Sequence, residues 1–219
     1  MKNIFLSASI PLPERHPRYY ETADIVAIRD AVIALASIAL NQHRIIWGGH
    51  PSITPLIYYV IEKMLINKLE REDWDLPLTE QEKELINTQL KGRIQDHVLL
   101  YQSLHFKDDF PPENEMFQNV VLTPDFGDMP SSIQLLREKM LGENEFSAAV
   151  FIGGMDGIID EYKIFREFHS KALVIPIAST GAAAKIVYDE YLPGDFKNER
   201  LVTNYGYMSL FQKLLIDKI

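Results

Sequence analysis

The chain alternates between two patterns of apolar residues. Short, nearly continuous apolar runs that end in small residues predict buried strands at residues 3–9, 44–49, 97–103, 119–123, 147–153 and 172–178. Between these runs, apolar residues recur at helical spacing and predict helices over residues 23–42, 52–70, 131–142, 158–170, 181–192 and 204–219. Buried strands that alternate with amphipathic helices are typical of a mostly parallel sheet with helices on both faces.

We therefore expect an α/β fold, a Rossmann-like three-layer sandwich with a mostly parallel central sheet, formed by a single domain over residues 1–219. Residues 71–96 break the alternation, because they are strongly charged, and we expect a helical excursion there. The longest apolar stretch, Ile25 to Leu40, is interrupted by Arg29 and Asp30. The sequence therefore predicts no membrane span and no membrane partner.

Composition narrows the partners and the chemistry. The net charge is −9, from 31 acidic and 22 basic residues, and the basic residues are spread thinly beside acids. A nucleic-acid partner needs a dense basic surface, so we expect none. The chain has no cysteine and no histidines or acids at metal-ligand spacing. We expect no disulfide, no metal and no other cofactor, and a cytoplasmic location.

Glycines and hydroxyl-bearing residues follow four of the predicted strands, at residues 7–9, 48–54, 153–157 and 179–181. In any one of these loops such residues are ordinary turn or cap residues. Together they place free N–H groups and hydroxyls along the carboxyl edge of the sheet, where helix N-termini suit a phosphate. We expect ligand contacts from Ser7, Ser9, Gly48, Gly49, His50, Thr54, Gly153, Gly154, Met155, Gly157, Glu161, Ser179, Thr180 and Gly181.

Two of these residues add titratable groups. Glu161 lies four residues after Gly157, in what we expect to be the first helical turn. Its carboxylate suits ribose hydroxyls or an oxocarbenium-like centre during N-glycosidic cleavage. The alternative is that Glu161, like Asp160, only favours the helix N-terminus electrostatically. His50 is a ligand contact or an acid–base group, or else a turn residue.

We also expect Gly154→Val to abolish ligand binding at little cost in folding stability.

Four stretches, in this order, carry a resemblance to a known family: IFLSAS, WGGHPSITPLI, GGMDGIIDEY and IPIASTGAAAK. They resemble the SLOG superfamily of Rossmann-like domains, named for the SMF/DprA and LOG proteins, and most of all the prokaryotic SLOG domains of nucleotide signalling and antiviral defence. The resemblance runs from the first predicted strand to the helix after Ser179, which is nearly the whole chain. It implies that a nucleotide or a nucleotide-derived molecule binds at the strand ends.

Within this superfamily, the LOG enzymes are phosphoribohydrolases with the signature PGGxGTxxE. Carried over to this chain, Gly153, Gly154 and Gly157 match the glycines that bind phosphate, and Glu161 matches the catalytic glutamate. Arg137 is the candidate for the separate catalytic arginine of these enzymes. The chain departs from the signature at Ile152 (for proline), at Ile158 (for threonine), and by one extra residue between Gly154 and Gly157.

The resemblance leaves two functions open. The first, which the departures favour, is a sensor of a cyclic or ADP-ribose-like signal that acts through a homo-oligomer or a separate effector protein. The second is an N-glycosidase, either a LOG-like phosphoribohydrolase or a deoxyribosyltransferase-like enzyme, with Glu161 as its catalytic residue. A sensor needs only N–H groups and hydroxyls, whereas glycosidic cleavage needs a placed carboxylate.

Overall fold

The computed structural model of the protein describes residues 1–71, 79, 81, 88, 92 and 95–219. These residues form a six-stranded sheet with the order β4-β3-β2-β1-β5-β6, and all neighbouring strands are parallel. The expected α/β sandwich with a parallel central sheet is confirmed. The strands are β1 (Asn3–Ser9), β2 (Arg44–Trp47), β3 (Val98–Ser103), β4 (Val120–Thr123), β5 (Ala148–Gly153) and β6 (Leu173–Ile177).

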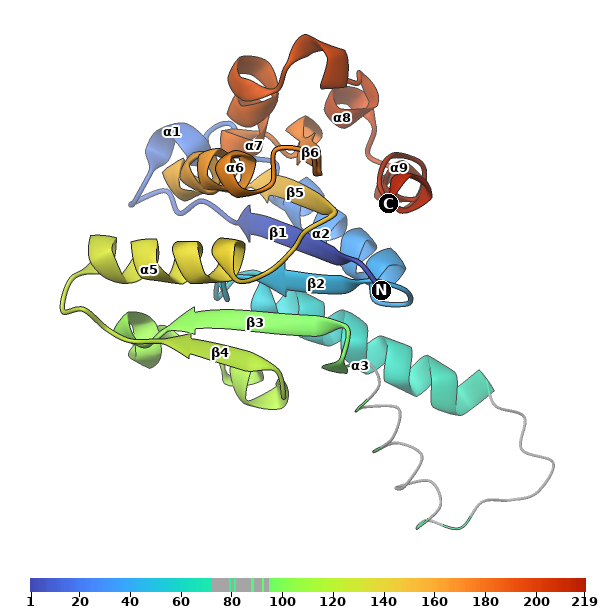
Figure 1. Ribbon diagram of the computed structural model, residues 1–219. Coiled ribbons are helices and arrows are strands. Elements are labelled where there is room, and N and C mark those ends of the chain that lie inside the picture. The colour runs from blue at the N-terminus through green and yellow to red at the C-terminus, as the bar shows by residue number, and fades with distance from the viewer. Residues whose placement is uncertain (72–78, 80, 82–87, 89–91, 93–94) are drawn as a thin grey trace.

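Helices cover both faces of this sheet (Figure 1). One layer contains α2, α3 and α9, and the other contains α5, α6 and α7. The helices of the described residues are α1 (Pro17–Tyr20), α2 (Ile25–Ala39), α3 (Thr54–Arg71), α5 (Met129–Gly142), α6 (Asp156–Phe168), α7 (Ala182–Ile186), α8 (Arg200–Thr203) and α9 (Tyr207–Leu214).

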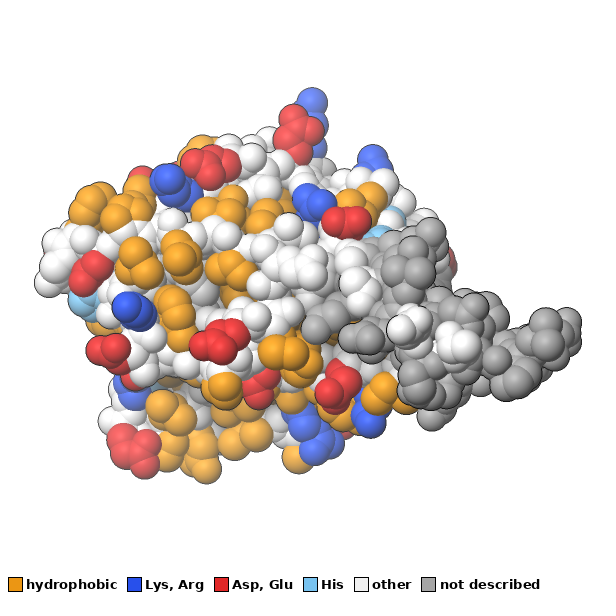
Figure 2. All heavy atoms as spheres, turned by 90° about the horizontal axis from the view of Figure 1, so that it is seen from below, with side chains coloured by type: hydrophobic (Ala, Val, Ile, Leu, Met, Phe, Trp, Pro, Cys, Tyr) orange, Lys and Arg blue, Asp and Glu red, His pale blue; other side chains and the backbone are white. Residues whose placement is uncertain are grey.

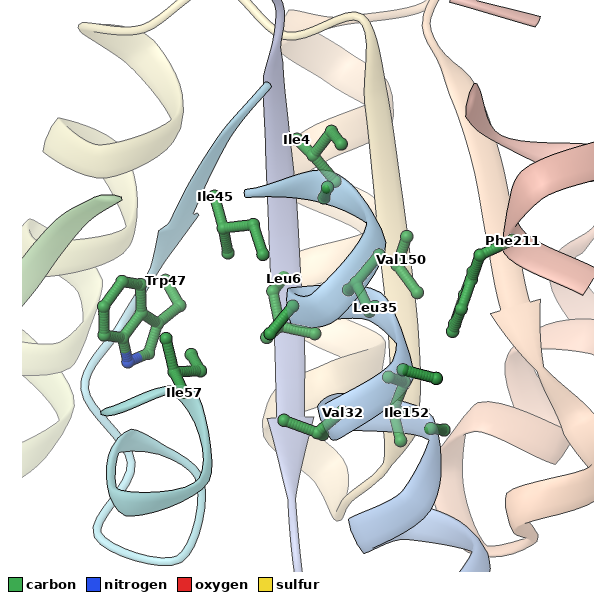
Figure 3. Close-up of a cluster of buried hydrophobic side chains, with 14 of the residues drawn as sticks. Ile4, Leu6, Val32, Leu35, Ile45, Trp47, Ile57, Val150, Ile152 and Phe211 are labelled. Carbon is green, nitrogen blue, oxygen red and sulfur yellow. The ribbon is translucent and has the colours of Figure 1, made fainter. Parts of the chain in front are cut away.

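The central strands are mostly apolar because both faces of the sheet pack against helical layers. In β1, Leu6 lies in the cluster under α2, whereas Phe5 lies in the cluster under α6. Figure 3 shows Leu35 of α2 and Phe211 of α9 directed at the first of these faces. On the other face Phe5 stacks on Phe165 of α6, with ring centroids 5.8 Å apart. The central strands therefore have no solvated face, and their free polar groups are at their ends.

Several element boundaries differ from the sequence prediction. Helix α6 begins at Asp156, two residues before the predicted start. The helix predicted over residues 181–192 is the short α7, continued by a π-helical turn at Val187–Tyr191. The helices α1 and α8 were not expected. The excursion expected over residues 71–96 lies largely outside the described residues, and the single domain over residues 1–219 stays a prediction.

Candidate functional site

The candidate site lies where the strand order reverses, between β1 and β5. From β1 the chain adds β2, β3 and β4 on one side, and it then returns to place β5 on the other side of β1. Ligands of open parallel sheets bind at such a reversal, outside the carboxyl ends of the strands. At this edge Ser9, the last residue of β1, pairs with Gly153, the last residue of β5. The helix that follows β5 there is α6 (Figure 1).

The N-terminus of α6 presents free N–H groups beside the hydroxyl of Ser9. Met155 precedes the helix without capping it, and no described residue accepts a hydrogen bond from the N–H of Met155, Asp156 or Gly157. Ser9 is 6% exposed, and its hydroxyl has no hydrogen-bond partner among the described residues. A β-carbon added to Gly154 would lie 3.3 Å from that hydroxyl oxygen. The Ser9 hydroxyl oxygen is not fully buried, so it can reach a ligand, and together with these N–H groups it suits an oxyanion.

Glu161 is held from two sides. The Ser7 hydroxyl donates to Glu161 Oε2 at 2.5 Å, and Arg137 Nε, from α5, donates to Oε1 at 3.2 Å. Arg137 also pairs with Asp160 at 3.3 Å and donates to the carbonyl of Gly157 at 3.2 Å. The Arg137 and Glu161 side chains are only 13% and 19% exposed. The structure therefore fixes a carboxylate and a guanidinium next to the glycine turn.

This arrangement changes two points of the sequence analysis. Because α6 begins at Asp156, Glu161 lies in the second helical turn, and its placement in the first turn was wrong. The sequence offers Arg137 as a candidate by default, and the structure brings it into contact with Glu161. No sequence signal could show this contact, since the two residues are on different helices.

The glycines that end β5 are required by the backbone itself. Gly153 and Gly154 have φ values of +58° and +78°. A β-carbon on Gly153 would overlap Ile28 of α2, and one on Gly154 would overlap Ile158 of α6. A valine at residue 154 would therefore be strained and would displace buried side chains. The expectation that Gly154→Val costs little stability is wrong.

The hydroxyls of the loop after β6 are already engaged. Thr180 is fully buried, accepts a hydrogen bond from the Gly153 N–H at 2.9 Å, and donates to the Ile177 carbonyl. The buried Ser179 hydroxyl lies 3.1 Å from the Tyr207 hydroxyl. Gly181 has a φ of +70°. This loop therefore supports the turn at Gly153, and direct ligand contacts from Ser179, Thr180 and Gly181 stay a prediction.

The loop after β2 is built around the partly buried His50. The Ser52 N–H donates to His50 Nδ1 at 3.2 Å, and the Ser52 hydroxyl lies 2.8 Å from the same nitrogen. Burial lowers the pKa of His50 to about 4, with a smaller contribution from Arg15. His50 is therefore neutral near pH 7, and its other ring nitrogen carries the proton because Nδ1 accepts.

The remaining residues of this loop have different environments. Thr54 is fully buried and accepts a hydrogen bond from Trp47 Nε1 at 3.1 Å. Gly49 has a φ of +62°, and the Gln102 amide occupies the space that a β-carbon would need. A β-carbon on Gly48 would make only an ordinary contact, 3.5 Å from Leu136 Cδ2. Gly48 is therefore the one glycine of this pair that a side chain could replace without strain.

The segment between β1 and α2 contributes contacts that sequence analysis missed. The Tyr19 hydroxyl, from α1, donates to Asp156 Oδ1, and Arg18 Nη2 donates to the same oxygen at 2.9 Å. The bond from Tyr19 holds the pKa of Asp156 below its usual range, with a further contribution from Arg18. Asp156 therefore ties α1 to the first residue of α6. The basic and aromatic stretch RHPRYY was the only available signal.

The charges of the surface match the balance of the sequence. On the face shown in Figure 2, basic side chains stand singly beside acidic ones. Within the described ranges, no three His, Asp or Glu side chains are grouped so as to hold a metal ion. None of the helices in the part of the chain that the structure describes has the length and apolar content of a membrane span. The expected absence of nucleic-acid and membrane partners stays a prediction.

The geometry agrees with the comparisons to known proteins. The model of the SLOG cluster3 family matches residues 18–72 and 83–215 of the chain. These residues include α6, the glycine turn before it, Arg137 and the loop after β6. A search of curated proteins returned no match. Membership of a SLOG family indicates a nucleotide-related function. The match spans most of the chain, which therefore belongs to the SLOG cluster3 family.

Proposed function

We propose that the protein is a sensor that binds a nucleotide-derived signal, cyclic or ADP-ribose-like, at the carboxyl ends of β1 and β5. The signal would belong to nucleotide signalling or antiviral defence, and the response would be a change in self-association or in a separate effector. The observation that carries the proposal is the solvent-accessible Ser9 hydroxyl, which has no partner among the described residues, beside the uncapped N-terminus of α6. Phosphate oxygens are the acceptors that such a group of donors suits best.

Binding without turnover is favoured by one further observation. Ile158, at the position of the threonine in the LOG signature, is 4% exposed and packs in the core under α6. An isoleucine side chain offers no hydroxyl to a phosphate, so the phosphate site of the enzymes is incomplete in this chain. The remaining N–H groups and the Ser9 hydroxyl are sufficient for binding.

A second candidate function is N-glycosidic hydrolysis, and the contact between Arg137 and Glu161 favours it. Glycosidic cleavage needs a carboxylate fixed near the anomeric carbon, and Glu161 is fixed by Ser7 and Arg137. Here Glu161 would stabilise the oxocarbenium-like centre electrostatically. Arg137 would hold the Glu161 side chain in place.

The experiment that tests binding is a thermal-shift screen with AMP, ADP-ribose, NAD and 3′,5′-cyclic nucleotides. A ligand that binds only the folded protein raises Tm in proportion to its affinity and concentration. We expect at least one of these compounds to raise Tm in a concentration-dependent way. No shift with any of them, confirmed by calorimetry, would contradict the proposal.

Ser9→Ala tests the site itself. We expect the variant to bind the same ligand roughly tenfold or more weakly, because one hydrogen bond to a charged group is worth about 1.5–3 kcal/mol. The Tm without ligand should not fall, since the lost hydroxyl has no partner. Ser132→Ala is the matched control: this buried hydroxyl accepts from the Phe126 N–H at 3.0 Å and is not a predicted ligand contact, so the variant should lose stability and keep its affinity. Ser9→Ala that keeps the wild-type affinity would exclude the Ser9 hydroxyl from the ligand site.

Glu161→Gln separates the two functions. In either function the amide should weaken binding only modestly, by about 1–3 kcal/mol. In a hydrolase, release of the base measured by chromatography should fall by roughly 10² or more, because the amide cannot stabilise the developing charge. In a sensor, the wild-type protein leaves its ligand intact over hours. Base release by the wild type that is lost in Glu161→Gln would overturn the sensor proposal.

A further inference from the structure

The outer ridge of α2 exposes two large apolar side chains beside one pair of opposite charges. The helix lies between α3 and α9, with Val32 and Leu35 directed at the sheet (Figure 3). On its outer side Ile25 and Val26 are 39% and 60% exposed. Two helical turns after Val26, Ile33 is partly buried and packs against the core cluster. The residues of this ridge recur at the spacing of a single helix face.

The neighbouring helix extends this apolar surface. Helix α9 packs against α2, Met208 in α9 is 49% exposed, and the preceding Tyr205 is 59% exposed and contacts the ring of Tyr207. Single exposed apolar residues need no explanation, whereas a group on two adjacent helices marks an interaction site. A stable interface covers about 800 Å² on each partner, which is more than one ridge provides. Both helices are therefore needed to form the surface.

The only charges on the α2 ridge among the described residues are adjacent and opposite. Arg29 Nε and Nη2 donate to Asp30 Oδ1 at 3.0 and 2.9 Å. Side chains of neighbouring helix residues normally point in different directions. The hydrogen bonds between Arg29 and Asp30 therefore hold their two side chains together on one ridge. The ridge therefore has no net charge, although the whole chain carries −9.

We propose that this ridge of α2, with Tyr205 and Met208, is the contact surface for a second copy of the chain. If two α2 helices pack antiparallel about a two-fold axis between Arg29 and Asp30, each Arg29 lies opposite Asp30 of the second copy. In the same register, Val26 lies opposite Ile33 of the second copy. A two-fold interface requires a self-complementary surface, and this ridge pairs charge with opposite charge and apolar residue with apolar residue. A second copy of the chain is the partner that this self-complementary pattern favours over an unrelated protein.

The first test is sedimentation of the full chain over a range of concentrations. The wild-type protein should form a dimer, of twice 25.2 kDa. Val26→Asp should weaken the dimer roughly tenfold or more, because it buries an unpaired charge in each half of the interface. Phe196→Asp is the matched control, since Phe196 is also 60% exposed and is not on this surface. Both variants should keep the wild-type Tm at concentrations where the chain is monomeric.

The second test is an exchange of the two charges. Arg29→Asp and Asp30→Arg should each weaken the homodimer, because each places like charges opposite one another. An equimolar mixture of the two variants should dimerise again, and so should the double variant, because both restore opposite charges across the axis. A monomeric wild type would overturn the proposal. A dimer that Val26→Asp leaves intact, or single charge variants that the mixture does not rescue, would overturn it as well.

Discussion

Alanine at residue 154 should destabilise the protein, and the structure allows the cost to be divided into two parts. The first part is the backbone conformation, because Gly154 has a φ of +78°. The second part is the side-chain clash, because the new β-carbon would overlap the outer carbons of Ile158, which is 4% exposed. Two other glycines separate these parts. Gly127 has a φ of +83° with nothing within 4 Å, and Gly194 has neither feature.

The expected free energies of unfolding follow from this comparison. Gly194→Ala should be neutral or slightly stabilising, because alanine restricts the unfolded chain by about 0.4–1 kcal/mol. Gly127→Ala should cost roughly 1–2 kcal/mol for the left-handed backbone. Gly154→Ala should cost a further 1–3 kcal/mol or so for the displaced Ile158 side chain. Its total of roughly 2–5 kcal/mol is a large fraction of the stability of a typical domain.

Urea unfolding of the three alanine variants measures these differences directly. Ile158→Ala in the Gly154→Ala background should recover about 1–3 kcal/mol relative to the sum of the single variants, because it removes the clash. Equal stability of Gly154→Ala and Gly194→Ala would refute the reasoning, since the loop would then relax without cost. Equal stability of Gly154→Ala and Gly127→Ala would refute the clash alone.

Two further predictions concern the same edge of the sheet. A β-carbon on Gly157 would lie 2.6 Å from Arg137 Nη2, so Gly157→Ala should displace the guanidinium that holds Glu161 and weaken ligand binding. Its free energy of unfolding should stay within about 1 kcal/mol of wild type, because alanine favours the helix; a larger loss would show that the backbone, not Arg137, is affected. Second, folded His50 stays neutral to about pH 4, whereas the unfolded chain protonates near 6.5. The unfolded state binds more protons between these values, so stability should fall by up to roughly 3 kcal/mol as the pH drops through this window. His50→Asn keeps an acceptor for the Ser52 N–H. In urea unfolding, this variant should be destabilised relative to wild type by less at pH 5 than at pH 7. Equal destabilisation at the two pH values would exclude His50 as the source of the pH dependence.

The strands could be predicted to within a residue or two because each is a continuous apolar run with small or polar residues at its end. The start of α6 could not, because Asp156 and Gly157 have the composition of a loop. In the structure, both residues are held in the first turn of the helix. Asp156 accepts hydrogen bonds from Tyr19 and Arg18, and the Gly157 carbonyl accepts one from Arg137. These contacts come from segments distant in sequence. No local pattern encodes them.

The candidate site was likewise predictable in part, because its place in the fold follows from the sequence pattern and its hydrogen bonds do not. The rule for parallel sheets correctly predicted that Ser9 and the end of β5 would meet at one edge. It could not show which hydroxyls are free. Thr54 is bonded to Trp47 and Ser179 to Tyr207, whereas Ser9 has no partner among the described residues. Those partners are side chains whose positions depend on the packing of the whole fold.

Helix α2 connects the candidate ligand site to the proposed dimer surface. At its start the Asp24 N–H donates to the Thr180 carbonyl at 3.1 Å, and Ile28 fills the space where a β-carbon on Gly153 would lie. On the proposed dimer surface, Arg29 directly follows Ile28, and Val26 lies two residues from both Asp24 and Ile28. A ligand held at the glycine turn and a second copy held at the ridge would therefore act on the same helical turn. Linkage then sets a condition on any sensor of this design: the factor by which ligand changes the dimer constant must equal the factor by which dimerisation changes ligand affinity.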